Sequence, residues 1–228
     1  VNANEAKEMV AAAQKSNVAL MEAMWSRFLP HYSQVREIIA SGVLGKILTV
    51  QADHGQRLAD QNIPRLIDPA LAGGALLDLG IYPVSFAHML LGNPSKITAS
   101  GVLSDKGVDA QTSMIFDYAD GAQAILNTTM IEQTPCRAVV AGVNGWLEID
   151  RTFYNPTSMR VTLSDGSVTQ YPNTYRGHGL REEAEAFKKL VLSGQTQSEL
   201  LSWKDTVDIM QTLDAVRSHI GLRYPFEN

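Results

Sequence analysis

Apolar and polar positions follow a helical period at the start of the chain. Over residues 3–16 the apolar side chains fall three or four positions apart, at Ala6, Met9, Val10 and Ala13. This spacing places them on one face of a helix, and Asn2 followed by Glu5 resembles the capping box that begins one. Residues 3–16 are therefore predicted to form a helix.

A short run without polar positions, Val18-Ala19-Leu20-Met21, comes next. A strand that is apolar on both faces is typical of the interior of a parallel sheet. Helix and buried strand together form the second half of a βαβ unit. We therefore interpret residues 1–26 as the C-terminal remnant of a Rossmann-type domain, whose partner strand would lie before residue 1. The alternative is an ordinary helix–strand pair docked on the following domain.

The pattern of residues 27–228 changes repeatedly between helical and strand periods. Helices are predicted from Pro30 to Gly42, from Ala75 to Leu91, and over 179–193 and 203–221. Residues 55–68 are polar enough to be a loop. Strands are predicted at 47–54, 95–104, 109–118, 122–131, 135–142, 145–150, 159–164 and 167–171.

The turns between these strands are short and contain glycine, as at Asp120-Gly121 and Asn144-Gly145. Strands joined by such turns must be antiparallel. We therefore predict an α+β domain: an open, largely antiparallel β-sheet with helices on one face, preceded by the Rossmann-type remnant.

The composition excludes several classes of protein. With 19 basic and 24 acidic residues the formal net charge is −5, so no basic excess is present to bind nucleic acid or an anionic membrane. No apolar run approaches the roughly 18 residues of a membrane-spanning helix. Cys136 is the one cysteine, which excludes an internal disulfide framework and is typical of a cytoplasmic protein.

The strand at 122–131 predicts the character of the face that the helices leave uncovered. Its outward positions include Gln123, Asn127 and Thr129, which are polar but not charged. Because interfaces are depleted in charge, this face is either a solvated surface or a dimer interface.

Candidate chemistry is concentrated in the run from Gly73 to Tyr82. Asp78 and Tyr82 are four residues apart, so they share a face of the predicted helix, and Gly73-Gly74 allow the backbone to approach a ligand or another strand closely. A phenol beside a carboxylate can relay a proton, although a phenol needs a nearby cation to act as a base at neutral pH. The alternative is that Asp78 caps the helix and Tyr82 is an amphipathic core residue.

Other candidates are weaker. Arg65 and Arg57 lie in the loop before the glycines, where a guanidinium can hold a substrate oxygen, although Arg57 is better explained as a solvated side chain. His178 precedes a helix and is either a surface histidine or a group that lines a cleft. The spacing of the five histidines and of Cys136 predicts no metal site. The sequence has no G-x-G-x-x-G, G-x-S-x-G or P-loop motif.

Several stretches together resemble one protein family. They are Glu22-Ala23-Met24-Trp25-Ser26-Arg27-Phe28, Asn62-Ile63-Pro64-Arg65, Gly73-Gly74-Ala75-Leu76-Leu77-Asp78-Leu79-Gly80-Ile81-Tyr82, Gly142-Val143-Asn144-Gly145-Trp146-Leu147-Glu148-Ile149, Gly179-Leu180 with Glu183-Ala184, and Leu222 with Tyr224-Pro225. This pattern resembles the glucose–fructose oxidoreductase/inositol dehydrogenase family, and most closely its branch of dimeric dihydrodiol and xylose dehydrogenases.

The resemblance implies a two-domain oxidoreductase that uses NADP or NAD, with its active site between the domains. It implies that Tyr82 transfers the proton and that Asp78 orients Tyr82 or the substrate. Trp25 and Arg27 match positions beside the nicotinamide half of the cofactor. Arg65 and His178 are then candidates for binding the substrate, a sugar-like polyol or a cyclic diol.

The sequence departs from the family at its front, because the glycine-rich fingerprint and the lysine of a Glu-Lys-Pro motif are absent. The resemblance implies that this lysine, just before a segment like Val1–Ala6, lowers the pKa of Tyr82 in the intact protein. We therefore expect residues 27–228 to be a substrate-binding and dimerisation domain that forms a homodimer through its sheet face. The chain alone is expected to be inactive. The alternative is a non-catalytic binding or oligomerisation module with the same fold.

Overall fold

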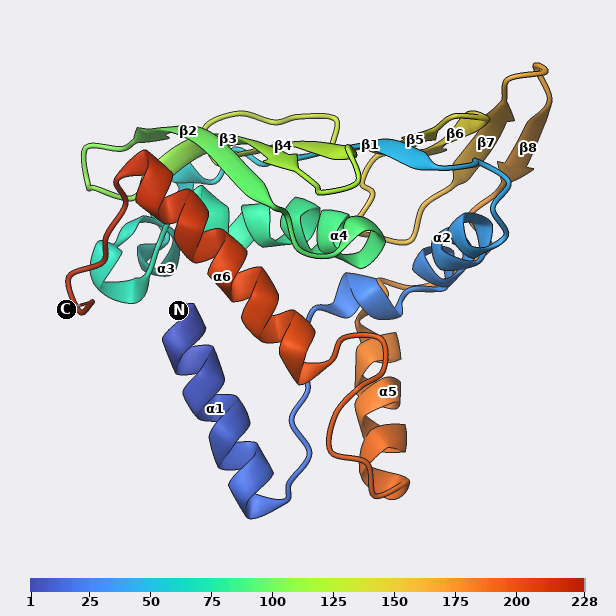
Figure 1. The fold of residues 1–228 in the computed structure, drawn as a ribbon. Helices are drawn as coiled ribbons and strands as arrows, with labels where there is room; N and C mark the ends of the chain where they lie inside the picture. Colours follow the sequence, from blue (N-terminus) through green and yellow to red (C-terminus); the bar gives the residue numbers. More distant parts are fainter. Residues whose placement is uncertain (228) are drawn as a thin grey trace.

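The centre of the computed structural model, which describes residues 1–227, is a single sheet of eight strands (Figure 1). Its order is β2-β3-β4-β1-β5-β6-β7-β8, and every neighbouring pair is antiparallel except β1 with β4. The predicted open, largely antiparallel sheet is confirmed. The strands are β1 (Ile47–Gly55), β2 (Lys96–Leu103), β3 (Asp109–Asp117), β4 (Gln123–Thr129), β5 (Ala138–Gly142), β6 (Gly145–Ile149), β7 (Met159–Leu163) and β8 (Val168–Tyr171).

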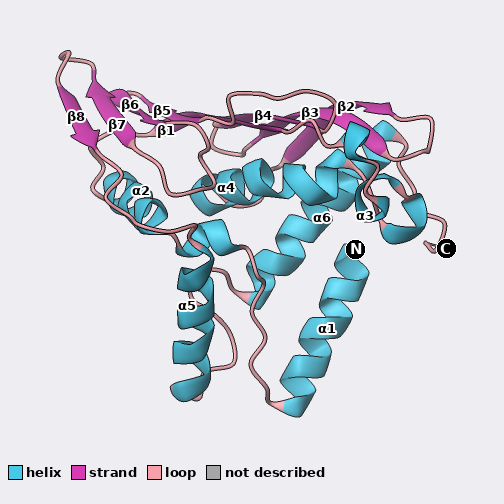
Figure 2. Ribbon diagram, turned by 180° about the vertical axis from the view of Figure 1, so that it is seen from behind, coloured by secondary structure: helices cyan, strands magenta, loops and turns pink. Residues whose placement is uncertain are grey.

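The helices all lie on one face of this sheet, as predicted (Figures 1 and 2). In both views α4 lies along the underside of the sheet, α6 slopes away from the sheet near β2, and α1 and α5 project away from it. The α-helices are α1 (Ala3–Ser16), α2 (Pro30–Ala40), α3 (Pro64–Ile67), α4 (Ile81–Leu91), α5 (Leu180–Leu192) and α6 (Trp203–Ile220).

The hydrophobic core lies between the sheet and the helices beneath it. Alternate residues of the central strands point down into it, including Met114, Phe116 and Leu126. Helices α4 and α6 supply the facing side chains, including Phe86, Leu213 and Val216. Each fully buried side chain of this kind contributes roughly 1.5–3 kcal/mol to stability. The segment that carries Asp78 and Tyr82 is thus fixed against the sheet by packing.

The stretch Pro69–Leu91 is apolar enough to resemble a membrane-spanning helix, with a mean hydropathy of 1.4. No stretch of this kind was expected from the sequence. Here 61% of its most apolar window is buried inside the fold, because its apolar side chains cover the sheet. In this structure it is a core helix.

The strand predicted at Val18–Met21 does not form. Within the described residues, 17–24 join no sheet, and the N–H of Leu20 is instead bonded to the carbonyl of Thr196 at 3.0 Å. An apolar run can form a parallel ladder only where a partner strand lies beside it. The helix before it is confirmed, because Asn2 caps α1 by accepting the N–H of Glu5.

The uncovered face of the sheet is less polar than β4 predicted. Ile125 points outward between Gln123 and Asn127, and it is paired with the outward Ile115 of β3. The two isoleucines are 45% and 43% exposed, whereas Thr129 is buried. The interpretation of this face as purely polar is therefore wrong. The two isoleucines and their polar neighbours line a shallow hollow of about 510 Å³.

Candidate active site

Tyr82 and Trp25 meet at the point where the chain first reaches the sheet domain. Trp25 begins a short 3₁₀ turn, Trp25–Phe28, and its indole N–H donates to the hydroxyl of Tyr82 at 2.9 Å. The two rings pack edge to face, with centroids 6.4 Å apart. Both side chains are only partly buried. Because an indole N–H can only donate, the hydroxyl hydrogen of Tyr82 remains free to bond to a ligand.

His54 and Tyr154 form an aromatic wall beside Tyr82. The ring of His54, at the end of β1, stacks on Tyr154 with centroids 4.0 Å apart, and each centroid lies 5.0 Å from that of Tyr82. The side-chain amide of Gln56 donates to His54 Nε2 at 2.8 Å, so His54 carries its proton on Nδ1. Burial lowers the pKa of His54 to about 4, which keeps this imidazole neutral.

Pro83 explains how His54 is held. Proline has no N–H, so Pro83 cannot make the α-helical bond to the carbonyl four residues earlier, that of Leu79. His54 Nδ1 lies 3.1 Å from this carbonyl and donates to it. The same region is a single π-helical turn, Leu76–Gly80, before α4 begins. Such turns are frequent at functional sites.

Asp78 is paired with Arg65, not used as a cap of its own helix. Arg65 Nη1 lies 2.5 Å from Asp78 Oδ1, and the arginine side chain is 66% exposed while that of Asp78 is 27% exposed. Of the two interpretations of Asp78, the helix cap is therefore not the one formed. An Arg–carboxylate pair at a partly exposed position presents both charges to a bound polar molecule.

The environment of Tyr82 keeps its phenol protonated. Burial raises the pKa of Tyr82, and the negative charges of Asp78 and Glu183 raise it further, while the bond from Trp25 lowers it. Among the described residues, the ionised groups that act on this phenol are thus acidic. In this chain Tyr82 is placed to donate a proton. The need for a nearby cation before this phenol can accept a proton stays a prediction.

Gly73 and Gly74 lie against other segments of the protein, not against open space. A Cβ on Gly73 would lie 2.8 Å from the backbone of Leu66, and one on Gly74 would lie 2.2 Å from Asp109 Oδ1. Gly74 also has a φ of +129°, which side-chain-bearing residues rarely adopt. Of the two predicted reasons for the pair, close approach to another segment is the one found.

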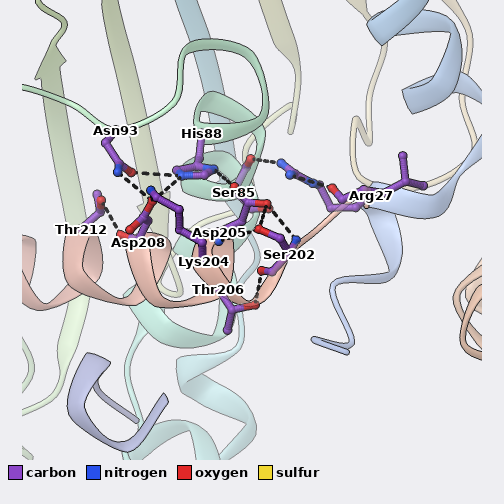
Figure 3. A network of polar contacts seen from close by, with 11 residues as sticks. Arg27, Ser85, His88, Asn93, Ser202, Lys204, Asp205, Thr206, Asp208 and Thr212 are labelled. Carbon is purple, nitrogen blue, oxygen red and sulfur yellow. Dashed lines mark hydrogen bonds and ion pairs between the residues drawn. The ribbon is translucent and has the colours of Figure 1, made fainter. Parts of the chain in front are cut away.

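Arg27 lies at the buried end of a polar network that joins α4 to α6 (Figure 3). Its guanidinium donates to the carbonyls of Ser85 at 2.8 Å and Leu200 at 3.1 Å, and the residue is 3% exposed. Burial lowers its pKa to about 10. The charge of Arg27 is therefore directed into the fold, although Arg27 is close in sequence to Trp25. Its predicted contact with the cofactor stays a prediction.

His178 lies at the rim of the Trp25–Tyr82 site. The residue is exposed, and the following Gly179 fits against the ring of Trp25, from which an added Cβ would be 3.2 Å away. Arg57 is exposed and paired with Asp60, in keeping with a solvated arginine. The structure thus gathers Trp25, Tyr82, Asp78 and Arg65 in one region, with His178 beside it.

Four residues near the site were not identified from the sequence: His54, Tyr154, Asp109 and Glu183. Three of them act on Tyr82 directly, His54 and Tyr154 by ring contact and Glu183 by its charge. His54 ends a predicted strand, which was a usable signal, because functional side chains often lie where strands end. Asp109 offered no local signal for this role, since Leu76, whose N–H it accepts, lies 33 residues away in the sequence.

Comparison with known proteins gives consistent matches across the chain. The model of the GFO/IDH/MocA C-terminal domain matches residues 32–148. Trans-1,2-dihydrobenzene-1,2-diol dehydrogenase of Xenopus tropicalis is 33% identical, over 99% of this chain and 70% of that protein. The Homo sapiens protein of the same name is 32% identical, over 99% of this chain and 69% of its own length.

Two solved structures share the fold. Aldose-aldose oxidoreductase from Caulobacter crescentus, complexed with glycerol, matches with a TM-score of 0.84 and 25% identity, over 96% of this chain and 66% of that one. The 3-ketoreductase KijD10 from Actinomadura kijaniata, in complex with NADP and TDP-benzene, matches with a TM-score of 0.84 and 25% identity, over 96% and 68%. The chain thus spans about two thirds of the length of these proteins.

Proposed function

Because the chain belongs to the GFO/IDH/MocA family, in the branch of the dihydrodiol dehydrogenases, we propose that it forms the substrate-binding part of an NAD(P)-dependent oxidoreductase. The relatives are dehydrogenases and reductases by name, and the solved structures include complexes with NADP and with NAD+. When bound, the nicotinamide exchanges a hydride with a carbon that bears the reacting oxygen.

The residues around Trp25 fit a nicotinamide. The indole is half-buried, so part of a flat aromatic surface is open to a ring-shaped ligand. Tyr82, bonded to the same indole, keeps its own hydrogen for a substrate oxygen. Trp25 would therefore border the cofactor. The sequence contains no glycine-rich phosphate-binding motif, so we propose that most of the cofactor is held by a dinucleotide-binding domain outside residues 27–228.

Tyr82 carries the proposed chemistry. The observation that supports it is its hydroxyl, held by Trp25 on one side, half-buried, and flanked by Asp78. With its pKa raised, the phenol donates a proton to the oxygen of a carbonyl that is being reduced. In the opposite direction it must accept the proton of an alcohol, and a cation supplied from outside this chain would then be needed to lower its pKa.

Asp78 and Arg65 are proposed to hold a neighbouring substrate hydroxyl. A carboxylate accepts and a guanidinium donates, so the pair can bind a hydroxyl group from both sides. His54 and Tyr154, which are 1% and 7% exposed, support the ring of Tyr82 from inside the fold. This arrangement supports a polyol, which is either a sugar-like molecule or a cyclic diol, with His178 at the rim.

The test is a substrate screen with the complete enzyme. Aldoses and trans-cyclic diols are offered with NADP+ and with NAD+, and reduced nicotinamide is followed by its absorbance. We expect saturable turnover of at least one class with one of the cofactors. No turnover of any of them with either cofactor would instead support a non-catalytic module with the same fold.

We also propose that the uncovered face of the sheet forms a homodimer. Its two outward isoleucines, Ile115 and Ile125, line the hollow together with mostly uncharged side chains, and Asp53 and Arg137 are the charged residues of its lining. A twofold axis through such a patch places the same surface of both copies together. A specific interface of this kind buries at least about 1,000 Å² in total.

A further inference from the structure

The first N–H of the segment that carries Asp78 and Tyr82 is held by a carboxylate from another element. Asp109, the first residue of β3, accepts the N–H of Leu76 at 2.8 Å through Oδ2 and is 0% exposed. The hydroxyl of Thr112 donates to the same oxygen at 3.1 Å. The first turn of a helix has N–H groups without partners, and a negative charge there is favourable.

The other side of the glycine pair is held from the C-terminal segment. The hydroxyl of Tyr224 donates to the carbonyl of Gly73 at 2.9 Å, and Tyr224 is 2% exposed. Tyr224 is itself fixed, because its N–H bonds to Glu227 at 3.1 Å and Arg217 lies over its ring at 5.1 Å. Glu227 and Arg217 form an ion pair.

These two contacts fix four residues of backbone, from Gly73 to Leu76. Neither Asp109 nor Tyr224 takes part in the chemistry proposed for Tyr82. Both nevertheless hold the turn that sets the direction of the Tyr82 side chain. The π-helical turn begins at Leu76. The direction of the backbone as it leaves the glycine pair therefore sets the positions of Asp78 and Tyr82. A different partner for the Leu76 N–H would change the direction of the whole segment.

We propose that Asp109 and Tyr224 are positioning residues, which together fix the start of the Leu76–Gly80 turn and so set the direction of Tyr82. The part of this inference that concerns turnover rests on the proposed function. The part that concerns the backbone does not, and it is tested separately.

The backbone part is tested by amide hydrogen exchange of the wild-type protein and the Asp109→Ala and Tyr224→Phe variants. Loss of one buried hydrogen bond should speed exchange of the amides of residues 76–80 by about tenfold or more. Asp165→Ala is the control, because Asp165 accepts the N–H of Ser167 at 2.8 Å in the turn between β7 and β8, outside the proposed site. Unchanged exchange at 76–80 in Tyr224→Phe and in any folded Asp109 variant would overturn the proposal.

The turnover part is tested by combining Asp109→Ala with Tyr82→Phe in the complete enzyme. A misdirected Tyr82 should lower kcat about ten- to a hundredfold, whereas the same change should cost less than about twofold when Tyr82 has no hydroxyl to aim. Asp109→Asn, which keeps an acceptor for Leu76, should recover most of kcat. Equal losses in both backgrounds would indicate a general loss of folded enzyme and would overturn positioning. Should Tyr82→Phe alone turn over normally, the proposed proton-transfer role of Tyr82 fails, and hydrogen exchange still decides the backbone part.

Discussion

Trp25 and Tyr82, 57 positions apart in the sequence, are joined by a hydrogen bond of 2.9 Å from the indole N–H to the phenol oxygen. An indole nitrogen can only donate, so the bond leaves the hydrogen of the phenol free. It also stabilises the deprotonated phenol, which partly offsets the effect of burial on the pKa of Tyr82. The residue that borders the proposed cofactor position thus also tunes the proposed acid.

Removal of this bond should shift the pH dependence of the enzyme. Trp25→Phe keeps an aromatic ring but removes the donor, so the pKa of Tyr82 should rise further. The basic limb of the kcat/KM profile should therefore move to higher pH by on the order of one unit. Trp146→Phe is the matched control, because Trp146 donates to Glu148 on β6, away from the site. Superimposable profiles for Trp25→Phe and wild type would contradict a tuning role.

Stability should fall on acidification because His54 is buried in its neutral form. Its pKa of about 4 in the folded state lies below the ordinary value of 6.5, so the unfolded chain binds more protons between these values. The stabilisation is complete above about pH 6.5 and is lost as the pH falls toward 4. The difference corresponds to a loss of at most about 3 kcal/mol.

Denaturant unfolding at several pH values measures this loss. In His54→Gln, which cannot titrate, the dependence on pH between 6.5 and 4 should be weaker than in wild type. His178→Gln, at an exposed position, is the control and should keep the wild-type slope. An unchanged slope in His54→Gln would show that other groups dominate the acid response.

Much of the sheet domain followed from the sequence, because its signals are local. Alternation marked the strands, short glycine turns fixed their antiparallel pairing, and helical spacing marked the helices. The parallel pair β1–β4 was not predicted, since a pairing across 74 positions, as from Thr49 to Gln123, leaves no mark in either strand. The strand at 18–21 failed for a related reason: apolar character alone does not supply a partner.

The site was predictable only in part. Asp78 and Tyr82 stood out because they share a short run with a glycine pair, and the structure places Tyr82 beside Trp25 and pairs Asp78 with Arg65. His54 and Tyr154 reach Tyr82 from β1 and from the loop before β7, and Asp109 holds the turn from β3. These contacts depend on the tertiary fold. The link from Pro83 to His54 through the carbonyl of Leu79 likewise required the structure.

A charge at the centre of the uncovered sheet face should prevent dimer formation. Ile125→Arg places a guanidinium against its own copy across a twofold axis, where like charges repel and are desolvated. Light scattering at micromolar concentration should report a dimer for wild type and a monomer for this variant. Leu192→Arg on α5, at a position that is 77% exposed and far from the face, should remain a dimer. A monomeric wild-type protein would contradict the dimer and indicate that this face is a solvated surface.

The polypeptide of residues 1–228 alone should bind reduced nicotinamide cofactors negligibly. The sequence has no glycine-rich motif to hold the pyrophosphate, and Trp25 offers only one side of a nicotinamide site. Titration followed by nicotinamide fluorescence should show no saturation, whereas the complete enzyme should saturate. Micromolar binding by the isolated polypeptide would mean that its own residues hold more of the cofactor than we propose.

The most direct test of the account is the kcat of Tyr82→Phe in the complete enzyme. This change keeps the ring and its contacts with His54 and Tyr154 and removes only the hydroxyl. If that hydroxyl is the general acid, kcat should fall about 10²–10⁴-fold while cofactor affinity stays near the wild-type value. Asp78→Asn should lower kcat less, since an amide replaces part of an orienting carboxylate. A Tyr82→Phe enzyme with wild-type kcat would contradict the proton-transfer role and leave Tyr82 as a packing residue.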